Sequence, residues 1–189
     1  MPLKTKVKAG NITNLSDARY CAGMGVDWLS FPADAVNPTT FKEITDWVTG
    51  PQFVLELKQS ASLDYISQYK ITSLEISSDQ LDLIDRLPSF EWIITLPLSS
   101  WSVRKNDLIR FKDKISLLVL ELDTQDLKAV SDIASHFKIL LNQTDKYSLD
   151  SLLEFPIEGI NVTGENELKP GLKDFEKLAS ILEELEVID

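Results

Sequence analysis

The chain has 189 residues, of which 43% are hydrophobic and 26% are charged, as is ordinary for a soluble globular protein with a sizeable core. The formal net charge of -11 excludes nucleic acid as an expected partner, because a phosphate backbone is bound by a basic surface. No apolar run is long enough for a membrane span, and the lysines near the start precede no apolar stretch, so we expect neither a membrane protein nor a signal peptide. The single cysteine, Cys21, rules out an internal disulfide and favours a cytoplasmic protein.

Short β-type runs recur along the whole chain. Several are almost entirely apolar, such as FVLEL, WIITL and SLLVLEL. Continuous apolar runs are typical of strands that are covered on both faces, as in a parallel sheet. We predict strands over residues 6–9, 28–31, 53–58, 73–76, 92–96, 117–122, 138–141 and 159–163.

Amphipathic helical patterns fill the intervals between these runs. We predict helices over residues 15–24, 38–48, 62–69, 80–87, 103–111, 124–137, 148–155 and 174–185. Several patterns begin with a residue type that caps a helix by accepting a hydrogen bond from its first turn. The candidate caps are Asn14, Asn37, Ser62, Thr124, Ser148 and Asp174.

Strict alternation of strand and helix, about 22 residues per unit, indicates compact βα units with short loops. Eight such units predict an α/β fold, a (β/α)₈ TIM barrel with trimmed loops that forms a single domain over residues 1–189. The alternative is an open doubly wound sheet, which usually carries a glycine-rich phosphate loop. This chain has seven glycines and no GxGxxG motif, which favours the barrel.

Both ends of the chain resemble one family. Residues 6–27, KVKAGNITNLSDARYCAGMGVD, resemble the opening strand and helix of the phosphoribosylanthranilate isomerases, commonly KVKICGITNLEDA. Residues 160–185, which include PGLKD at 170–174, resemble the last strand and helix of that family. Between the ends, the resemblance rests on the strand order and on LDT at residues 122–124.

The resemblance implies an aldose–ketose isomerase, an intramolecular oxidoreductase of tryptophan biosynthesis that rearranges a phosphoribosyl amine with one general acid and one general base. The family's base is a cysteine that falls on Gly10, which has no side chain to accept a proton. The family's acid falls on Asp123, the candidate general acid here, although that residue and Thr124 are also placed to cap the following helix. An arginine that binds the anthranilate part falls on Asp34.

Further positions carry over to substrate binding. Lys8 lies two residues before Gly10, so alternation along a strand points both to the same side. It is placed either to bind an anion or to form a structural ion pair. The family's glycine-rich phosphate cradle falls on Asn142 and, after the last strand, on Thr163 and Gly164, with Glu167 at a further matching position. Bulkier residues restrict the approach of backbone amides to a phosphate.

Charged residues inside predicted strands need partners if they are buried. Glu56, Glu75 and Glu121 are such residues, and they either line a pocket with Lys8 or Lys58 as partners or face the helices and reach solvent. We expect no metal site, since one cysteine and one histidine, His136, cannot form a typical zinc centre, and we expect no cofactor.

Three functions follow from these observations. The chain is a working isomerase, a non-catalytic barrel that binds a small ligand or a protein partner, or an enzyme for a different reaction that uses Asp123 with Lys8 or the strand glutamates. The missing base at Gly10 favours an impaired or inactive isomerase, a pseudoenzyme. The net charge leaves room for a small phosphorylated ligand, and the expected assembly is a monomer or a homodimer.

Overall fold

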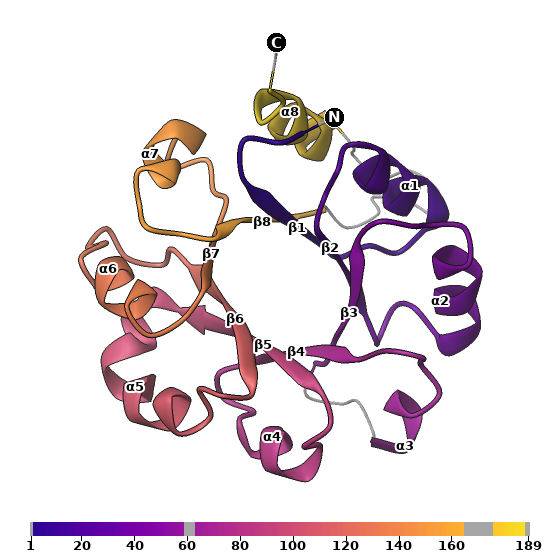
Figure 1. Ribbon diagram of the computed structural model, residues 1–189, viewed down its shortest axis with the longest axis horizontal. Coiled ribbons are helices and arrows are strands. Elements are labelled where there is room, and N and C mark those ends of the chain that lie inside the picture. The colour runs from indigo at the N-terminus through magenta and orange to yellow at the C-terminus, as the bar shows by residue number, and fades with distance from the viewer. Residues whose placement is uncertain (1, 59–62, 165–175, 188–189) are drawn as a thin grey trace.

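The computed structural model describes residues 2–58, 63–164 and 176–187, and Figure 1 shows a ring of strands with the helices outside it. All strands are parallel, and the ring is closed by pairing of the first strand with the last. The strands are β1 (Lys6–Gly10), β2 (Trp28–Pro32), β3 (Gln52–Glu56), β4 (Ser73–Ser77), β5 (Glu91–Pro97), β6 (Ile115–Glu121), β7 (Ile139–Asn142) and β8 (Gly159–Thr163). The predicted (β/α)₈ barrel is confirmed, and the open doubly wound sheet is excluded.

Helices follow the strands in the predicted order. They are α1 (Leu15–Gly23), α2 (Pro38–Thr45), α3 (Leu63–Ile66), α4 (Asp82–Arg86), α5 (Trp101–Arg110), α6 (Ala129–Ala134), α7 (Leu149–Leu153) and α8 (Glu176–Glu184), and a 3₁₀ turn, η1 (Leu98–Ser100), precedes α5. Short helices are sufficient here because each has only to cover the barrel wall behind it.

Three of the predicted caps are confirmed, since the side chains of Asn14, Asn37 and Ser148 accept hydrogen bonds from backbone N–H groups in the first turns of α1, α2 and α7. The prediction for Thr124 is wrong. Its hydroxyl accepts from the N–H of Asp126 in a turn, and α6 begins only at Ala129. The remaining two, Ser62 and Asp174, lie outside the described residues.

The apolar residues form two separate cores. The larger one lies between the barrel wall and the helices and includes Cys21, on α1, and Trp92. The smaller one fills the barrel interior with Val54, Ile93, Leu117, Val119 and Leu140. Trp47 lies outside both cores, with 74% of its surface exposed.

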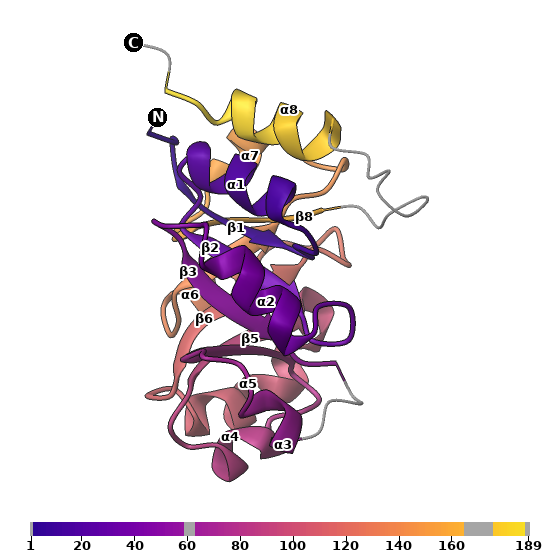
Figure 2. The same ribbon diagram turned by 90° about the vertical axis from the view of Figure 1, so that its right-hand side faces the viewer.

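The seam between β1 and β8 is paired over five residues, from Lys6 opposite Gly159 to Gly10 opposite Thr163. A Cβ atom at Gly159 would lie 2.0 Å from the carbonyl oxygen of Lys6, so the close approach of these two strands requires a glycine there. In Figure 2, α1 and α8 lie side by side over this seam. No helix among the described residues is both long and apolar enough to cross a membrane.

Candidate functional site

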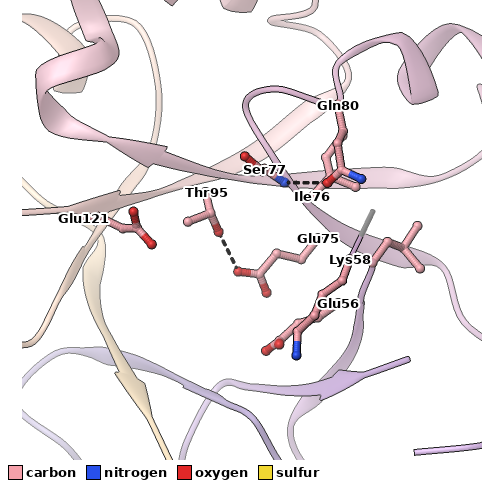
Figure 3. Close-up of a pocket in the computed structure, with 9 residues that line it drawn as sticks. Glu56, Lys58, Glu75, Ile76, Ser77, Gln80, Thr95 and Glu121 are labelled. Atoms are coloured by element: carbon pink, nitrogen blue, oxygen red, sulfur yellow. Dashed lines mark hydrogen bonds between the residues drawn. The ribbon is translucent and has the colours of Figure 1, made fainter. Parts of the chain in front are cut away.

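Two adjoining pockets lie at the carboxyl ends of the strands, the end at which (β/α)₈ barrels carry their active sites. The central pocket, about 160 Å³, is lined by Lys8, Gly10, Glu56, Glu75, Thr95, Val119, Glu121, Asn142, Asn161 and Thr163. The side pocket, about 390 Å³, extends towards the ends of β3 and β4 and is lined by Glu56, Leu57, Lys58, Glu75, Ile76, Ser77, Gln80, Thr95 and Glu121. Figure 3 shows the carboxylates of Glu56, Glu75 and Glu121 directed into this shared space from three strands.

Lys8 and Glu75 form a buried ion pair between β1 and β4. Only 1% of the Lys8 side chain is exposed, and its Nζ lies 2.8 Å from Oε2 of Glu75. The same ammonium donates to Oδ1 of Asn161 at 3.0 Å. Glu75 also accepts from the hydroxyls of Ser30, at 2.8 Å, and Thr95, at 2.9 Å. The ion pair that is one of the two alternatives for Lys8 is therefore present, and this lysine also lines the central pocket, so a role in binding an anion stays a prediction.

Lys58, the other predicted partner, does not pair with a strand glutamate. It is exposed, and its Nζ lies 3.1 Å from Oδ2 of Asp34. Asp34, the position onto which the sequence resemblance places the family's arginine, is paired with a lysine that lines the side pocket.

Glu56 occupies the space beside Gly10. Its Oε1 lies 3.1 Å from the point at which a Cβ of residue 10 would stand, and Nζ of Lys8 lies 3.6 Å from the same point. The backbone N–H of Asn11 donates to this carboxylate at 3.2 Å. Burial raises the pKa of Glu56, and the negative charge of Glu75 raises it further, while Lys8 and the hydrogen bond from Asn11 oppose the shift. A carboxylate that readily takes up a proton thus stands where the sequence shows no proton acceptor.

Asn11 holds the end of β1 in an unusual conformation. Its φ is +57°, in the left-handed region that asparagine tolerates better than most residues. Its side-chain Nδ2 donates to the carbonyl oxygen of Gly164 at 2.9 Å, which ties β1 to the end of β8. This turn directs the N–H of Asn11 towards Glu56, so its conformation helps to position that carboxylate.

The end of β6 presents Glu121 to the pockets, whereas Asp123 is among the lining residues of neither. Burial raises the pKa of Glu121, and the nearby charge of Asp123 adds to the shift. Asp123 is exposed and accepts from the hydroxyl and, at 3.0 Å, from the backbone N–H of Ser99, which lower its pKa. The sequence leaves open whether Glu121 lines a pocket or faces the helices; alternation along the strand from Val119, which also lines the central pocket, is the signal that favours the pocket.

The ends of β7 and β8 are tied together by amide side chains. Nδ2 of Asn161 donates to Oδ1 of Asn142 at 2.8 Å and, more distantly, to the hydroxyl of Thr163. Asn142 and Thr163, which the sequence resemblance places in substrate binding, both line the central pocket. The amide of Gly164 donates to the carbonyl of Gly10 at 3.0 Å and is engaged within the barrel wall. An anion at this end would need other donors. Glu167 lies outside the described residues.

The single cysteine and the single histidine of the chain lie away from the pockets. Cys21 is fully buried in the outer core, and His136 contacts Asp132 and the ring of Trp101 on the helix layer. Among the described residues, no group of three or more acidic, histidine or cysteine side chains is arranged to hold a metal ion.

The fold and the site together define the class of protein: a (β/α)₈ barrel with charged pockets at the carboxyl ends of its strands. No protein-family model matches the chain, and no curated protein matches it by sequence. Among solved structures it is similar to a phosphoribosylanthranilate isomerase in complex with reduced 1-(o-carboxyphenylamino)-1-deoxyribulose 5-phosphate, with a TM-score of 0.74, 17% identity, and 95% of this chain and 97% of that one covered.

The phosphoribosylanthranilate isomerase from Thermotoga maritima gives a TM-score of 0.69 at 17% identity, with 90% of this chain and 92% of that one covered. Thiamine phosphate pyrophosphorylase from Pyrococcus furiosus gives 0.59 at 13% identity, with 97% and 98% covered. The resemblance to phosphoribosylanthranilate isomerases that the sequence indicates is therefore found again in the fold. Identities this low show a shared architecture and leave the activity to be argued from the site.

Proposed function

We propose that this chain is a ligand-binding (β/α)₈ barrel, built like a phosphoribosylanthranilate isomerase, that does not catalyse the rearrangement of phosphoribosylanthranilate. The observation that carries the proposal is the carboxylate of Glu56, 3.1 Å from the point where a side chain at Gly10 would begin. In the family, a cysteine at that position is the base, so the mouth of this barrel has been rebuilt around a different group.

Charge supports the proposal. The family's substrate carries a phosphate and a carboxylate, and both are negative. The described lining of the two pockets contains the carboxylates of Glu56, Glu75 and Glu121. Its two cations, Lys8 and Lys58, are already paired with acids. Like charges brought together in a site that excludes water cost several kcal/mol, so a doubly anionic substrate is disfavoured.

The pockets suit a small molecule with hydroxyl or amide groups. The side pocket, about 390 Å³, falls near the lower end of the range for small-molecule sites, and the central pocket, about 160 Å³, adjoins it and is smaller. Thr95, Asn142 and Thr163 place hydroxyl and amide groups in the central pocket, while Leu57 and Ile76 give the side pocket an apolar wall. This mixture provides orientation by hydrogen bonds and affinity by burial.

A second candidate, the isomerase itself, is favoured by one specific observation. Glu56 is both close to the position of the missing thiol and raised in pKa, as a general base that works near neutral pH should be. Glu121, with its own raised pKa, would then be the acid in place of Asp123.

Fluorescence of phosphoribosylanthranilate distinguishes the two. We expect the purified protein to leave the signal unchanged relative to buffer. If the protein turns the substrate over, and if Glu56→Gln abolishes this turnover while the control Asp123→Asn retains it, the second candidate replaces the proposal. Thermal unfolding with ribose and with ribose 5-phosphate tests the charge argument, because a ligand that binds the folded state raises the melting temperature. We expect any stabilisation by ribose to exceed that by its phosphate.

A further inference from the structure

We infer that Lys8 is a nucleophilic lysine that captures a small hydroxylated aldehyde or ketone as an imine in the central pocket. The inference rests on the proposed function in one respect, namely that the barrel mouth is the ligand site. It adds the reacting atom and the chemical class of the ligand.

Lys8 is placed for this role by its position inside the barrel. An ammonium has three N–H donors, and two of them are directed to Oε2 of Glu75 and Oδ1 of Asn161. The central pocket touches the same side chain. Although almost no surface of Lys8 is exposed, its side chain lines the central pocket, a partly open space of about 160 Å³.

Gly10 adds no side chain to the space that Nζ of Lys8 shares with the carboxylate of Glu56. A Cβ at this position would lie 3.1 Å from Oε1 of Glu56, 3.6 Å from Nζ of Lys8 and 3.8 Å from Oγ1 of Thr163. With hydrogen in place of that carbon, a carbonyl carbon can approach the lysine from the pocket. The absence of a side chain at Gly10, which removes the family's base, is therefore what opens the approach to Lys8.

Glu56 supplies the proton transfers that imine formation requires. Attack needs the neutral amine, so the ammonium must first give a proton to a neighbour. Glu56 stands on the far side of the space over Gly10 and forms no ion pair with Lys8, so the proton reaches it through a water or the ligand in that space. Burial raises the pKa of Glu56, which favours its protonated form. Glu75, in direct contact with Nζ, keeps the lysine in place while this happens.

The reaction balances without any further reactant. The lone pair of Nζ forms a bond to the carbonyl carbon, and the carbonyl oxygen takes a proton from Glu56 to give a carbinolamine. A second proton then passes from the nitrogen through Glu56 to the hydroxyl, the C–O bond breaks and water leaves. The nitrogen lone pair closes the C=N bond of a protonated imine, which keeps the third proton and its positive charge beside Glu75. Nothing is oxidised or reduced, and one water is released for each carbonyl bound.

The lining selects the ligand class. Thr95, Asn142 and Thr163 offer hydrogen bonds to hydroxyl groups on the carbons next to the carbonyl. Glu56 and Glu121 disfavour a carboxylate or phosphate on the ligand. A short hydroxy-ketone such as dihydroxyacetone is therefore the probe of choice, and pyruvate is its anionic comparison.

The test is reductive trapping followed by peptide mapping. The full chain is incubated with dihydroxyacetone and cyanoborohydride, and each lysine is examined by mass spectrometry for the reduced three-carbon adduct. Lys6, exposed on the same strand, and Lys58, at the rim of the side pocket, are controls within the same molecule. We expect labelling of Lys8 to exceed theirs by at least about tenfold, and pyruvate to label it less than dihydroxyacetone does.

Two variants show whether the pocket causes the labelling. Glu56→Gln should slow labelling of Lys8 by about 100-fold, the lower end of the contribution of a general acid–base group, while Lys6 and Lys58 react as before. Gly10→Ala leaves every charge in place and should also slow it by filling the space beside Nζ. Equal labelling of the three lysines, or labelling of Lys8 that neither variant changes, would overturn the inference. That result is distinct from phosphoribosylanthranilate turnover, which alone would overturn the proposed function.

Discussion

The ion pair inside the barrel makes a strong prediction for Lys8→Met. Methionine fills a similar volume but removes the ammonium, and Glu75, whose side chain is only 10% exposed, is left without its counter-charge. Removing one partner of a buried pair costs about 3–5 kcal/mol of unfolding free energy. Because the hydroxyls of Ser30 and Thr95 still donate to Glu75, we expect the low end, about 3 kcal/mol, which lowers the melting temperature of a chain this size by roughly 6–12 °C.

Urea unfolding followed by circular dichroism measures this change, and a double-mutant cycle assigns it to the pair. Glu75→Gln alone leaves the ammonium of Lys8 buried without its counter-charge, so it too should be destabilising. The double variant Lys8→Met/Glu75→Gln removes both charges of the pair and should recover most of the loss. A loss below about 1 kcal/mol for Lys8→Met, or a double variant equal to the sum of the two singles, would show that the pair behaves like an exposed one and would refute the reasoning.

Gly159→Ala should lower the free energy of unfolding in urea by at least about 3 kcal/mol, because its Cβ meets backbone at 2.0 Å. Gly10→Ala, whose Cβ meets only side chains, should lower it by about 1 kcal/mol or less, and equal losses would contradict the contact at the seam. Asn11→Ala should lose about 2 kcal/mol of unfolding free energy, because alanine is strained in the left-handed backbone and one hydrogen bond is removed. Asn11→Gly should lose less, because glycine is not strained there, and urea unfolding of the two variants checks this order. The pKa of Glu56 in the folded protein lies above its ordinary value of 4.5, so folding favours the protonated carboxyl. This contribution to the free energy of unfolding is complete below pH 4.5 and is lost as the pH rises through the raised folded pKa. Glu56→Gln should remove that decline and be the more stable protein at pH 7, as unfolding curves between pH 4 and pH 8 will show; a variant with an unchanged pH profile would mean that the carboxylate titrates normally.

Much of the fold follows from local patterns in the sequence. The strand predicted over residues 159–163 has the observed bounds of β8, and the alternation that places Lys8 and Gly10 on one side of β1 holds. The helix predicted to begin at Thr124 is wrong because the hydroxyl closes a local turn, an alternative that the periodicity of apolar residues does not register.

The site is less predictable because its key contacts join strands that are not neighbours. Glu56 on β3 meets Gly10 on β1 across the barrel interior, past β2, and this meeting depends on how the strands are staggered around the ring. Resemblance to the family directs attention to Asp123, whereas only the inward alternation of β6 indicates Glu121. A catalytic role for Asp123 stays a prediction, with its carboxylate held by Ser99.

The β1–β8 seam also determines when the pocket comes into existence during synthesis. Lys8 and Asn161, which share a hydrogen bond across it, are separated by 153 residues of chain. Contacts between such distant segments form late, because the intervening chain must be ordered first. On the ribosome, a nascent polypeptide that still lacks β8 has neither Asn161 beside the lysine nor Gly164 beside Asn11, so this side of the central pocket forms only once β8 has emerged.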